Sequence, residues 1–299
     1  MGAIIIAPFL ISIMAIQLIP LSERNLKVQG DGISYDPNQL AYSTNHIINL
    51  PTNIHLCDFD RITLFKYYSF DSLKYVLQDH QLFINKVSSW DDKYENFFLK
   101  CKFVFGNNYV ADDNFLDGVF GQSWTTSPET DALWRIYSQD CKGIRVRTTA
   151  RKLFDALYID NDSMSNLWFG KVKYDYMSSF IKQIEHQIHT SPFNNQPENA
   201  FGVILPETEF MKRREFEHEE EFRAILILDS ERTKIAKNYD RLAFDINLND
   251  FIEEYCLDPR LSNEECDFQK EKLIEMGVDS YKITRSTLYD FQPHTFVLN

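Results

Sequence analysis

A run of acidic residues directly before an apolar stretch is the part of this chain best suited to chemistry. Five carboxylates lie within residues 215–221, and the apolar stretch 222–228 follows at once. If a β-strand begins early in this run, its two-residue period points Glu217, Glu219 and Glu221 to one face. Like charges this close repel one another, and burial raises the pKa of at least one. The run therefore predicts either a solvated acidic turn or a pair, Glu219 and Glu221, held by a strand at the mouth of a cleft.

A second acidic group leaves a metal-dependent reaction open as an alternative. Asp91, Asp92 and Glu95 lie in a polar segment and, together with Glu219 and Glu221, could hold a divalent cation through oxygen ligands. That arrangement would suit a phosphodiesterase. The sequence contains no GxxxxGK[ST], GxGxxG, HExxH or GxSxG motif, and its histidines and cysteines show no zinc-ligand spacing. The leading interpretation therefore includes no resident metal.

The elements that must position these residues begin near Arg61. Branched, aromatic and alternating residues predict strands at 62–67, 82–84, 99–105, 119–124, 143–149, 167–174, 222–228 and 279–284. Helical spacing predicts helices that begin at the cap Asp71 and at Asp131, Ala150 and Tyr176, and a last one that begins at the Ser262-x-x-Glu265 capping box. Short strands mixed irregularly with helices indicate the α+β class.

The N-terminal region differs from this body. Residues 3–19 are apolar but too short and too interrupted by proline for a typical membrane span, and no positive charge precedes them as in a secretory signal. A membrane anchor, a native start at Met14, and a segment docked on the body are the alternatives. We expect three parts: an apolar segment at 1–24, an irregular arm or linker at 25–60, and a single α+β domain at 61–299.

The composition describes an acidic, aromatic-rich globular protein. The 299 residues carry a net charge of −13 and include 24 Phe and 15 Tyr, enough for a large core. The negative charge disfavours non-specific binding of nucleic acid by the whole surface. A local basic patch could still sense nucleic acid: Lys142, Arg145, Arg147, Arg151 and Lys152. Five cysteines without a CxxC motif fit reduced thiols and a cytoplasmic location.

Six short motifs in order resemble the bacterial family known as domain of unknown function 2971. The motifs are Phe65-Lys66-Tyr67, the acidic loop 90–95, Gln122-Ser123-Trp124, Trp134 with Tyr137, Gly143-Ile144-Arg145-Val146, and Lys212 and Phe216 with the run 219–223. The resemblance covers about residues 61–288. It departs in the acidic loop, which has Asp91-Asp92 and lacks the family's usual Asn and Pro, and the first 60 residues lie outside the match.

A second resemblance supplies a mechanism. Arg61, then the run 123–127, then Glu219-x-Glu221 before an apolar strand is similar to the Arg…Ser-Thr-Ser…Glu-x-Glu pattern of ADP-ribosyltransferases. The resemblance implies that NAD lies across a split sheet as co-substrate. It implies that the last glutamate, Glu221, binds the nicotinamide ribose and stabilises an oxocarbenium-like transition state.

The same resemblance implies roles for the other residues. Either Arg61 or Lys66 would hold the phosphates or ribose, and Ser123, Trp124 and Thr125 would order the start of the site. An aromatic side chain, Tyr67, Trp124 or Phe222, would stack on the nicotinamide ring.

We therefore expect an α+β fold with a split, mostly antiparallel sheet flanked by helices, and NAD-dependent ADP-ribosyl transfer or NAD cleavage. A bacterial toxin or anti-phage effector would use this activity on a protein or nucleic-acid acceptor, restrained by an inhibitory partner. The alternatives are a non-catalytic module that senses a ligand or nucleic acid, and the metal-dependent phosphodiesterase.

Overall fold

The computed structural model describes residues 59–92, 94–101, 103–105, 108–110, 115–157, 165–190, 204–228, 233–234 and 236–297. The expected N-terminal segment 1–24 and almost all of the expected arm 25–60 lie outside these residues. The three alternatives for residues 3–19 therefore stay predictions. Within the described part, no helix is both long and apolar enough to cross a membrane.

Among the described residues, nine strands form one mixed sheet in which a single pair is parallel. Its main path runs β11 (Arg241–Asp245), β2 (Gln81–Lys86), β5 (Val119–Thr125), β1 (Thr63–Tyr68), β6 (Ile144–Thr149), β12 (Glu254–Leu257) and β13 (Ile283–Arg285). β10 (Glu221–Leu228) pairs with β5, and β7 (Ser165–Lys171) pairs with β10. β13 lies parallel to β12. The expected α+β class with a mostly antiparallel sheet is confirmed.

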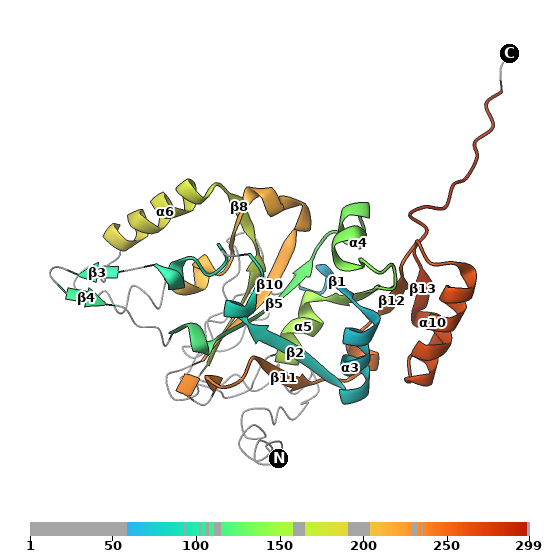
Figure 1. Ribbon diagram of the computed structural model, residues 1–299, viewed down its shortest axis with the longest axis horizontal. Helices are drawn as coiled ribbons and strands as arrows, with labels where there is room; N and C mark the ends of the chain where they lie inside the picture. The colour runs from blue at the N-terminus through green and yellow to red at the C-terminus, as the bar shows by residue number, and fades with distance from the viewer. Residues whose placement is uncertain are drawn as a thin grey trace.

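Helices flank this sheet (Figure 1). They are α3 (Phe70–Asp79), α4 (Asp131–Tyr137), α5 (Ala150–Leu157), α6 (Met177–Thr190), α9 (Leu248–Phe251) and α10 (Asn263–Glu275). α6 lies near one end of the molecule and α10 near the other. Two small two-stranded sheets pair β3 (Phe103–Phe105) with β4 (Asn108–Val110) and β8 (Lys173–Asp175) with β9 (Met211–Arg213). Short 3₁₀ turns are η2 (Val87–Ser89), η3 (Phe98–Lys100), η4 (Phe115–Gly118), η5 (Arg214–Glu219) and η6 (Ser280–Lys282).

The sheet opens along one edge of β5. β10 pairs with β5 over the whole length of β5. On the opposite edge, β2 pairs with Phe120 and Gly121, and β1 pairs with Thr125. In the described part of the chain, no strand pairs with the residues between, 122–124, on that edge. A side chain takes the place of a strand partner at Ser123, because Lys66 Nζ donates to the carbonyl oxygen of Ser123 at 2.7 Å.

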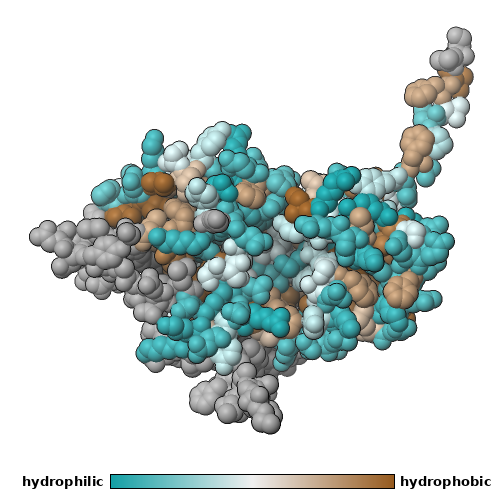
Figure 2. Space-filling view, in the orientation of Figure 1, coloured by the Kyte–Doolittle hydropathy of each residue, from teal (hydrophilic) through white to brown (hydrophobic). Residues whose placement is uncertain are grey.

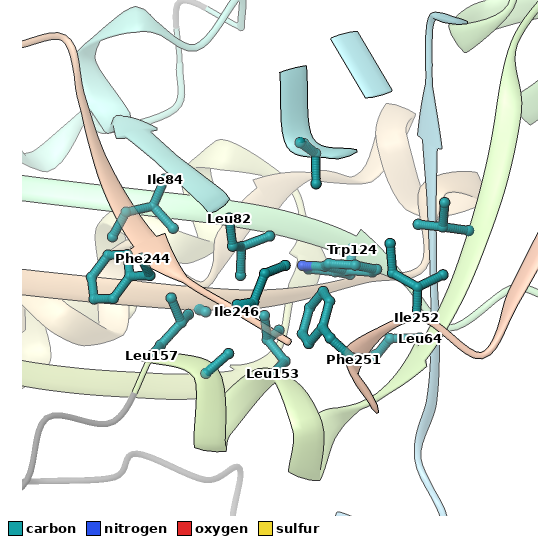
Figure 3. Close-up of a cluster of buried hydrophobic side chains, with 14 of the residues drawn as sticks. Leu64, Leu82, Ile84, Trp124, Leu153, Leu157, Phe244, Ile246, Phe251 and Ile252 are labelled. Atoms are coloured by element: carbon teal, nitrogen blue, oxygen red, sulfur yellow. The ribbon is translucent and has the colours of Figure 1, made fainter. Parts of the chain in front are cut away.

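The core fixes which face of β10 points toward this opening. Phe222, Ala224 and Leu226 belong to the larger of two buried apolar clusters, as the two-residue period of a strand requires. Glu221 and Arg223 therefore lie on the other face. Figure 3 shows part of the larger cluster, in which the Trp124 ring packs edge-on against Phe251 with centroids 6.0 Å apart.

Several sequence expectations need correction. Ser69, and not Asp71, caps α3, because the Ser69 hydroxyl accepts from the Ser72 N–H at 3.1 Å. The expected strands at 99–105 and 279–284 are each shorter, since a 3₁₀ turn takes up part of the range (η3 and η6). The Ser262–Glu265 capping box of α10 is confirmed. The sequence reading did not predict β11, α9 or β12.

Candidate active site

A cavity of about 740 Å³ lies at the opening in the sheet. Its lining includes Lys66 of β1, Ser123 of β5 and Glu221 of β10, and α3 and β2 form the side away from β10. A smaller compartment of about 130 Å³ adjoins this cavity. The same three residues, together with Glu219 and Tyr137, line both spaces. The molecular surface is hollowed near the middle of the face drawn in Figure 2, where β1, β2, β5 and β10 meet in Figure 1. Residues far apart in the sequence thus converge on one cleft.

The acidic run reaches the cleft through a turn, and the expectation of an early strand is wrong. Residues 214–219 form the 3₁₀ turn η5, Glu220 has the left-handed φ of 42°, and β10 begins at Glu221. The carbonyl oxygen of Glu220 accepts from both the N–H and the hydroxyl of Thr126, which fixes the reversal. Glu219 and Glu221 are therefore both buried beside the cleft. Glu217, expected on the same face, is exposed instead.

Lys212, on a different strand, lies between the carboxylates of Glu219 and Glu221. Lys212 Nζ of β9 lies 2.6 Å from Glu219 Oε2, 2.6 Å from Glu221 Oε1 and 3.1 Å from Glu95 Oε1. The same ammonium lies 4.7 Å from the centroid of the Phe216 ring. All four charged groups are buried, so each carboxylate requires a nearby cation.

Arg223 supplies the second buried cation. Its Nε donates to Glu221 Oε2 at 2.8 Å, its Nη1 donates to the carbonyl oxygen of Glu209 at 2.7 Å, and its Nη2 donates to Glu95. The guanidinium lies 4.5 Å from the Trp90 ring centroid. Gly121 makes room for that ring, since a Cβ there would lie 2.7 Å from Trp90. The planar guanidinium therefore fixes both oxygens of Glu221 in place together with Lys212.

These contacts separate the pKa values of the two glutamates. Burial opposes ionisation of Glu221, but the charges of Arg223 and Lys212 outweigh it and hold the pKa of Glu221 well below its usual range. Burial and a hydrogen bond shared with Glu221 raise the pKa of Glu219 to about 7, although Lys212 opposes the shift. Two cations, Lys212 and Arg223, can neutralise only two of the three carboxylates in this cluster. The third, Glu219, therefore keeps its proton over part of the physiological pH range. Glu221 thus keeps a fixed negative charge beside the cleft.

Lys66 forms the opposite wall. Loss of water around the half-buried ammonium lowers its pKa to about 8, while the charge of Glu221 acts in the other direction. The Nζ atom lies 5.7 Å from the Tyr68 ring centroid and 5.8 Å from that of Trp124. Lys66 therefore still carries a positive charge at neutral pH.

The expected site residues fall into two groups. Lys66, Tyr67, Ser123, Trp124, Thr125, Glu219 and Glu221 all line the cleft or its compartment. Arg61 does not line either space; it is exposed and precedes β1.

The aromatic residues expected to stack on a ligand differ in their exposure. The Trp124 side chain is only 2% exposed, and its indole N–H donates to Gln122. Phe222 is fully buried in the core. Tyr67 stacks on Tyr137 with ring centroids 6.0 Å apart, and both line the compartment. The Tyr67 ring also packs edge-on against the buried Trp134 with centroids 4.8 Å apart, so Tyr67 is the half-buried member of the expected trio.

Sequence reasoning did not select Arg223, Tyr137 or Trp90 as site residues, and it considered Glu95 only as a possible metal ligand. Arg223 and Glu95 are 128 residues apart in the chain, and no local spacing indicates that they meet. One signal was present in the sequence: Arg223 follows Glu221 by two residues in a strand, so both side chains must lie on one face.

Two features of the structure bear on the metal-dependent reaction and on nucleic-acid sensing by the basic patch. Within the described residues, no group of three or more His, Cys, Asp or Glu is arranged to hold a metal ion. Asp92 pairs with Arg213 at 2.8 Å, and Glu95 pairs with Lys212 and Arg223. Four of the five basic-patch residues form ion pairs with carboxylates: Arg145 with Glu129 and Glu254, Arg147 with Glu253 and Glu254, Arg151 with Asp60, and Lys152 with Glu253.

Comparisons with known proteins gave structural matches alone. No protein-family model matches the sequence, and no curated protein does, so the resemblance to domain of unknown function 2971 is not confirmed. Two solved structures match, both of DarT from Thermus sp. 2.9. The complex with NAD+ has a TM-score of 0.33 and 11% identity, over 75% of this chain and 95% of that one. The complex with carba-NAD+ has a TM-score of 0.31 and 12% identity, over 75% and 94%.

Proposed function

We propose that this protein cleaves the bond between nicotinamide and ribose in NAD and passes the ADP-ribosyl group to an acceptor, either water or a macromolecule. The observation that carries the proposal is the buried carboxylate of Glu221, held on one oxygen by Lys212 and on the other by Arg223 beside a cleft of about 740 Å³. Pockets for small molecules and cofactors span roughly 300–1,000 Å³, so the cleft is of a size to take a dinucleotide.

The reaction requires a negative charge in this position. When the carbon–nitrogen bond breaks, its electron pair leaves with neutral nicotinamide, and the ribose carbon and ring oxygen share a positive charge. The acceptor then adds to that carbon and releases a proton. A carboxylate that is already ionised and already oriented stabilises the developing cation without reorganising at the moment of reaction. Lys212 and Arg223 provide that orientation through the contacts described above.

The compartment suits the leaving group. It is bordered by the rings of Phe65, Tyr67 and Tyr137, and it opens beside Glu221. Flat aromatic ligands bind by stacking on such rings and by leaving water. We infer that nicotinamide occupies it, and that Lys66, on the opposite wall, contacts the ribose or the phosphates.

The decisive experiment measures nicotinamide release from NAD by the purified protein and by two variants. Glu221→Gln keeps the size of the side chain but removes the charge, so turnover should fall on the order of 10² to 10³ while KM changes much less. Glu220→Gln is the matched control, because Glu220 is exposed and adjacent in sequence. Its turnover should equal that of the parent.

Two results would reject the proposal. One is a parent protein that releases no nicotinamide at any pH or with any acceptor tested. The other is an equal, mild loss in both variants, which would show that the charge of Glu221 has no specific part in turnover. The melting temperature of Glu221→Gln must be recorded alongside, since Lys212 and Arg223 lose part of their counter-charge.

The biological setting belongs to the same proposal. In a bacterium, this activity would suit a toxin or an anti-phage effector that acts on a protein or nucleic-acid acceptor and is restrained by an inhibitory partner. Nicotinamide release in the absence of any acceptor would identify NAD cleavage as the basal reaction.

A further inference from the structure

The cations around the cleft fall into two classes by their partners. Lys212 and Arg223 are each in contact with two or more buried carboxylates. Lys66 and Arg241 also line the cleft, yet among the described residues neither forms an ion pair with a carboxylate. Cations without a carboxylate partner, in a cleft otherwise rich in acidic groups, are the natural contacts of an anionic ligand.

Arg241 is held in place by the sheet and by an aromatic ring. It is the first residue of β11, and its Cα partner is Asn85 of β2, which in turn pairs with Gly121 of β5. Its guanidinium lies 4.5 Å from the centroid of the Phe83 ring. This stacking leaves the N–H groups at the edge of the guanidinium available, so the side chain is preoriented for planar, two-point recognition of an oxyanion.

The two cations lie on opposite sides of the opening in the sheet. Lys66 Nζ is fixed to the carbonyl oxygen of Ser123, which is two residues along β5 from Gly121. Arg241 is two strands away from Gly121. Neighbouring strands lie about 4.8 Å apart and residues rise about 3.4 Å along a strand, so the Cα atoms of Arg241 and Ser123 are about 12 Å apart. Both long side chains can therefore contact one extended ligand in the cleft.

We propose that Arg241 and Lys66 form a diphosphate-binding pair, and that Arg241 makes the cleft select nucleoside diphosphate groups over the corresponding nucleosides. The inference rests on the proposed function in that it names the part of NAD that Arg241 recognises. Arg241 is a binding residue on β11, remote from Glu221. It contributes affinity for the diphosphate in the ground state and the transition state alike.

The test measures binding and therefore does not depend on turnover. Isothermal titration of ADP and of adenosine is carried out with the parent protein, Arg241→Gln, Arg241→Lys and Lys270→Gln. Lys270 is exposed on α10, so Lys270→Gln removes one positive charge from the molecule without touching the cleft. We expect the parent to bind ADP more tightly than adenosine.

Arg241→Gln should weaken ADP binding about ten-fold or more, the effect of losing hydrogen bonds from a charged group, and leave adenosine binding unchanged. Arg241→Lys should be intermediate, because it keeps the charge but loses the planar fork. Lys270→Gln should match the parent with both ligands. ADP binding of the parent should also weaken with added salt, and less so in Arg241→Gln.

Three results would overturn the inference: equal ADP affinity in Arg241→Gln and the parent, an equal loss for ADP and adenosine, or no preference of the parent for ADP. These outcomes are separable from failure of the proposed function. A protein that releases no nicotinamide but shows Arg241-dependent ADP binding has the anion site without the reaction. A protein that cleaves NAD with the same KM after Arg241→Gln has the reaction without this site.

Discussion

At the scale of single residues, the cleft illustrates how neighbours assign different roles to identical groups. Glu219 and Glu221 contact the same lysine, yet Arg223 lies against Glu221 and keeps it ionised. Glu219 is left with a pKa of about 7 and a hydrogen bond to its neighbour. Coupled carboxylates share their protons, so the pair titrates as a unit.

The titration of Glu219 leads to a prediction about pH. As the pH rises through about 7, Glu219 loses its proton and the negative charge beside the cleft increases. If a ribosyl cation develops there, kcat for nicotinamide release should rise over the same interval. In Glu219→Gln this inflection should be absent, while any inflection near pH 8 from Lys66 persists. A pH–rate profile of both proteins checks the prediction, and an inflection near 7 that survives in the variant contradicts it.

A second carboxyl group leads to a prediction about stability. Glu209 is 1% exposed, and among the described residues neither of its carboxylate oxygens has a hydrogen-bond partner. Burial raises its pKa to about 8, against the opposing charge of Arg223. In the unfolded chain, the pKa of a glutamate side chain is about 4.3. Between these pH values the folded protein keeps a proton that the unfolded chain has lost, so stability falls as pH rises through this window and is fully present below it.

Glu209→Gln should remove this dependence. Relative to the variant, the parent should lose up to about 1.4 kcal/mol of unfolding free energy for each pH unit between about 5 and 8. Urea unfolding of both proteins at several pH values gives the difference. A difference that stays constant with pH would mean that Glu209 is ionised in the folded state throughout.

At the scale of elements, the helix that carries Tyr137 is fastened to a distant loop. The fully buried Asp258 accepts from Ser138 Oγ at 2.5 Å and from Arg260 Nη2 at 2.6 Å. Arg260 Nη2 also donates to the carbonyl oxygens of Ser138 and Trp134, at 2.6 and 3.1 Å. The Trp134 carbonyl lies in the last turn of α4 and the Ser138 carbonyl just after it, and each also accepts one backbone N–H, from Ser138 and from Cys141 respectively. These contacts of Asp258 and Arg260, together called the Asp258–Arg260 clip, therefore hold α4 in place. They also hold Tyr137, which lines the cleft.

Breaking this clip should cost stability. Asp258→Asn leaves Arg260 without its counter-charge, and we expect a loss of about 1–3 kcal/mol in the free energy of unfolding. The matched control is Asp267→Asn, because Asp267 is exposed on α10 and loses the same charge. Urea unfolding measures both. Equal midpoints for the two variants would show that α4 is held by other contacts.

The elements also show what the sequence could and could not predict. β10 and β5 were predictable because each is seven or eight residues long and contains several branched or aromatic residues, which in β10 belong to the continuous apolar run 224–228. β11, α9 and β12 are four or five residues long. The two strands pair with partners far away in the chain, such as Arg241 with Asn85, and α9 packs against α5. Such segments depend on tertiary pairing more than on local propensity.

The same contrast applies to the cleft. The Glu219-x-Glu221 pair and the strand that carries Ser123 could be predicted from the sequence, because each lies within one local segment. The partners that set the chemistry, Lys212 with Glu95 and Arg223 with Glu95, join segments 117 to 128 residues apart. One local expectation failed for a tertiary reason: Glu220 takes a left-handed turn because Thr126 binds its carbonyl oxygen.

At the scale of the whole molecule, the described residues fill two apolar clusters that share the sheet. The larger includes Phe59 and Val278, and the smaller packs α6 against the opposite side of β10 through Ile225. Residues 291–297, the last that the structure describes, extend away from the body with Phe291 and Phe296 exposed (Figures 1 and 2), whereas Ser286 and Tyr289 still contact Glu129 and Asp131. The cleft lies on the part of the sheet that packs against both clusters.

The first 24 residues are set apart from the body in the sequence. Gly30, Gly32 and Pro37 lie between residues 1–24 and the part of the chain that the structure describes. A shortened protein that begins at Asn25 should therefore fold and bind ADP as the longer one does. We expect its melting temperature to differ by less than about 2–4 °C, the shift that 1 kcal/mol produces in a chain of this size.

Thermal unfolding of the two proteins, followed by circular dichroism, measures the difference, and sedimentation with phospholipid vesicles separates the remaining alternatives. If residues 3–19 anchor the protein, only the longer protein should sediment with vesicles, and both should melt alike in solution. If the segment docks on the body, the shortened protein should melt far lower and neither protein should sediment. Equal melting without sedimentation would agree with a native start at Met14, because the removed residues would then contribute neither to the core nor to a membrane contact.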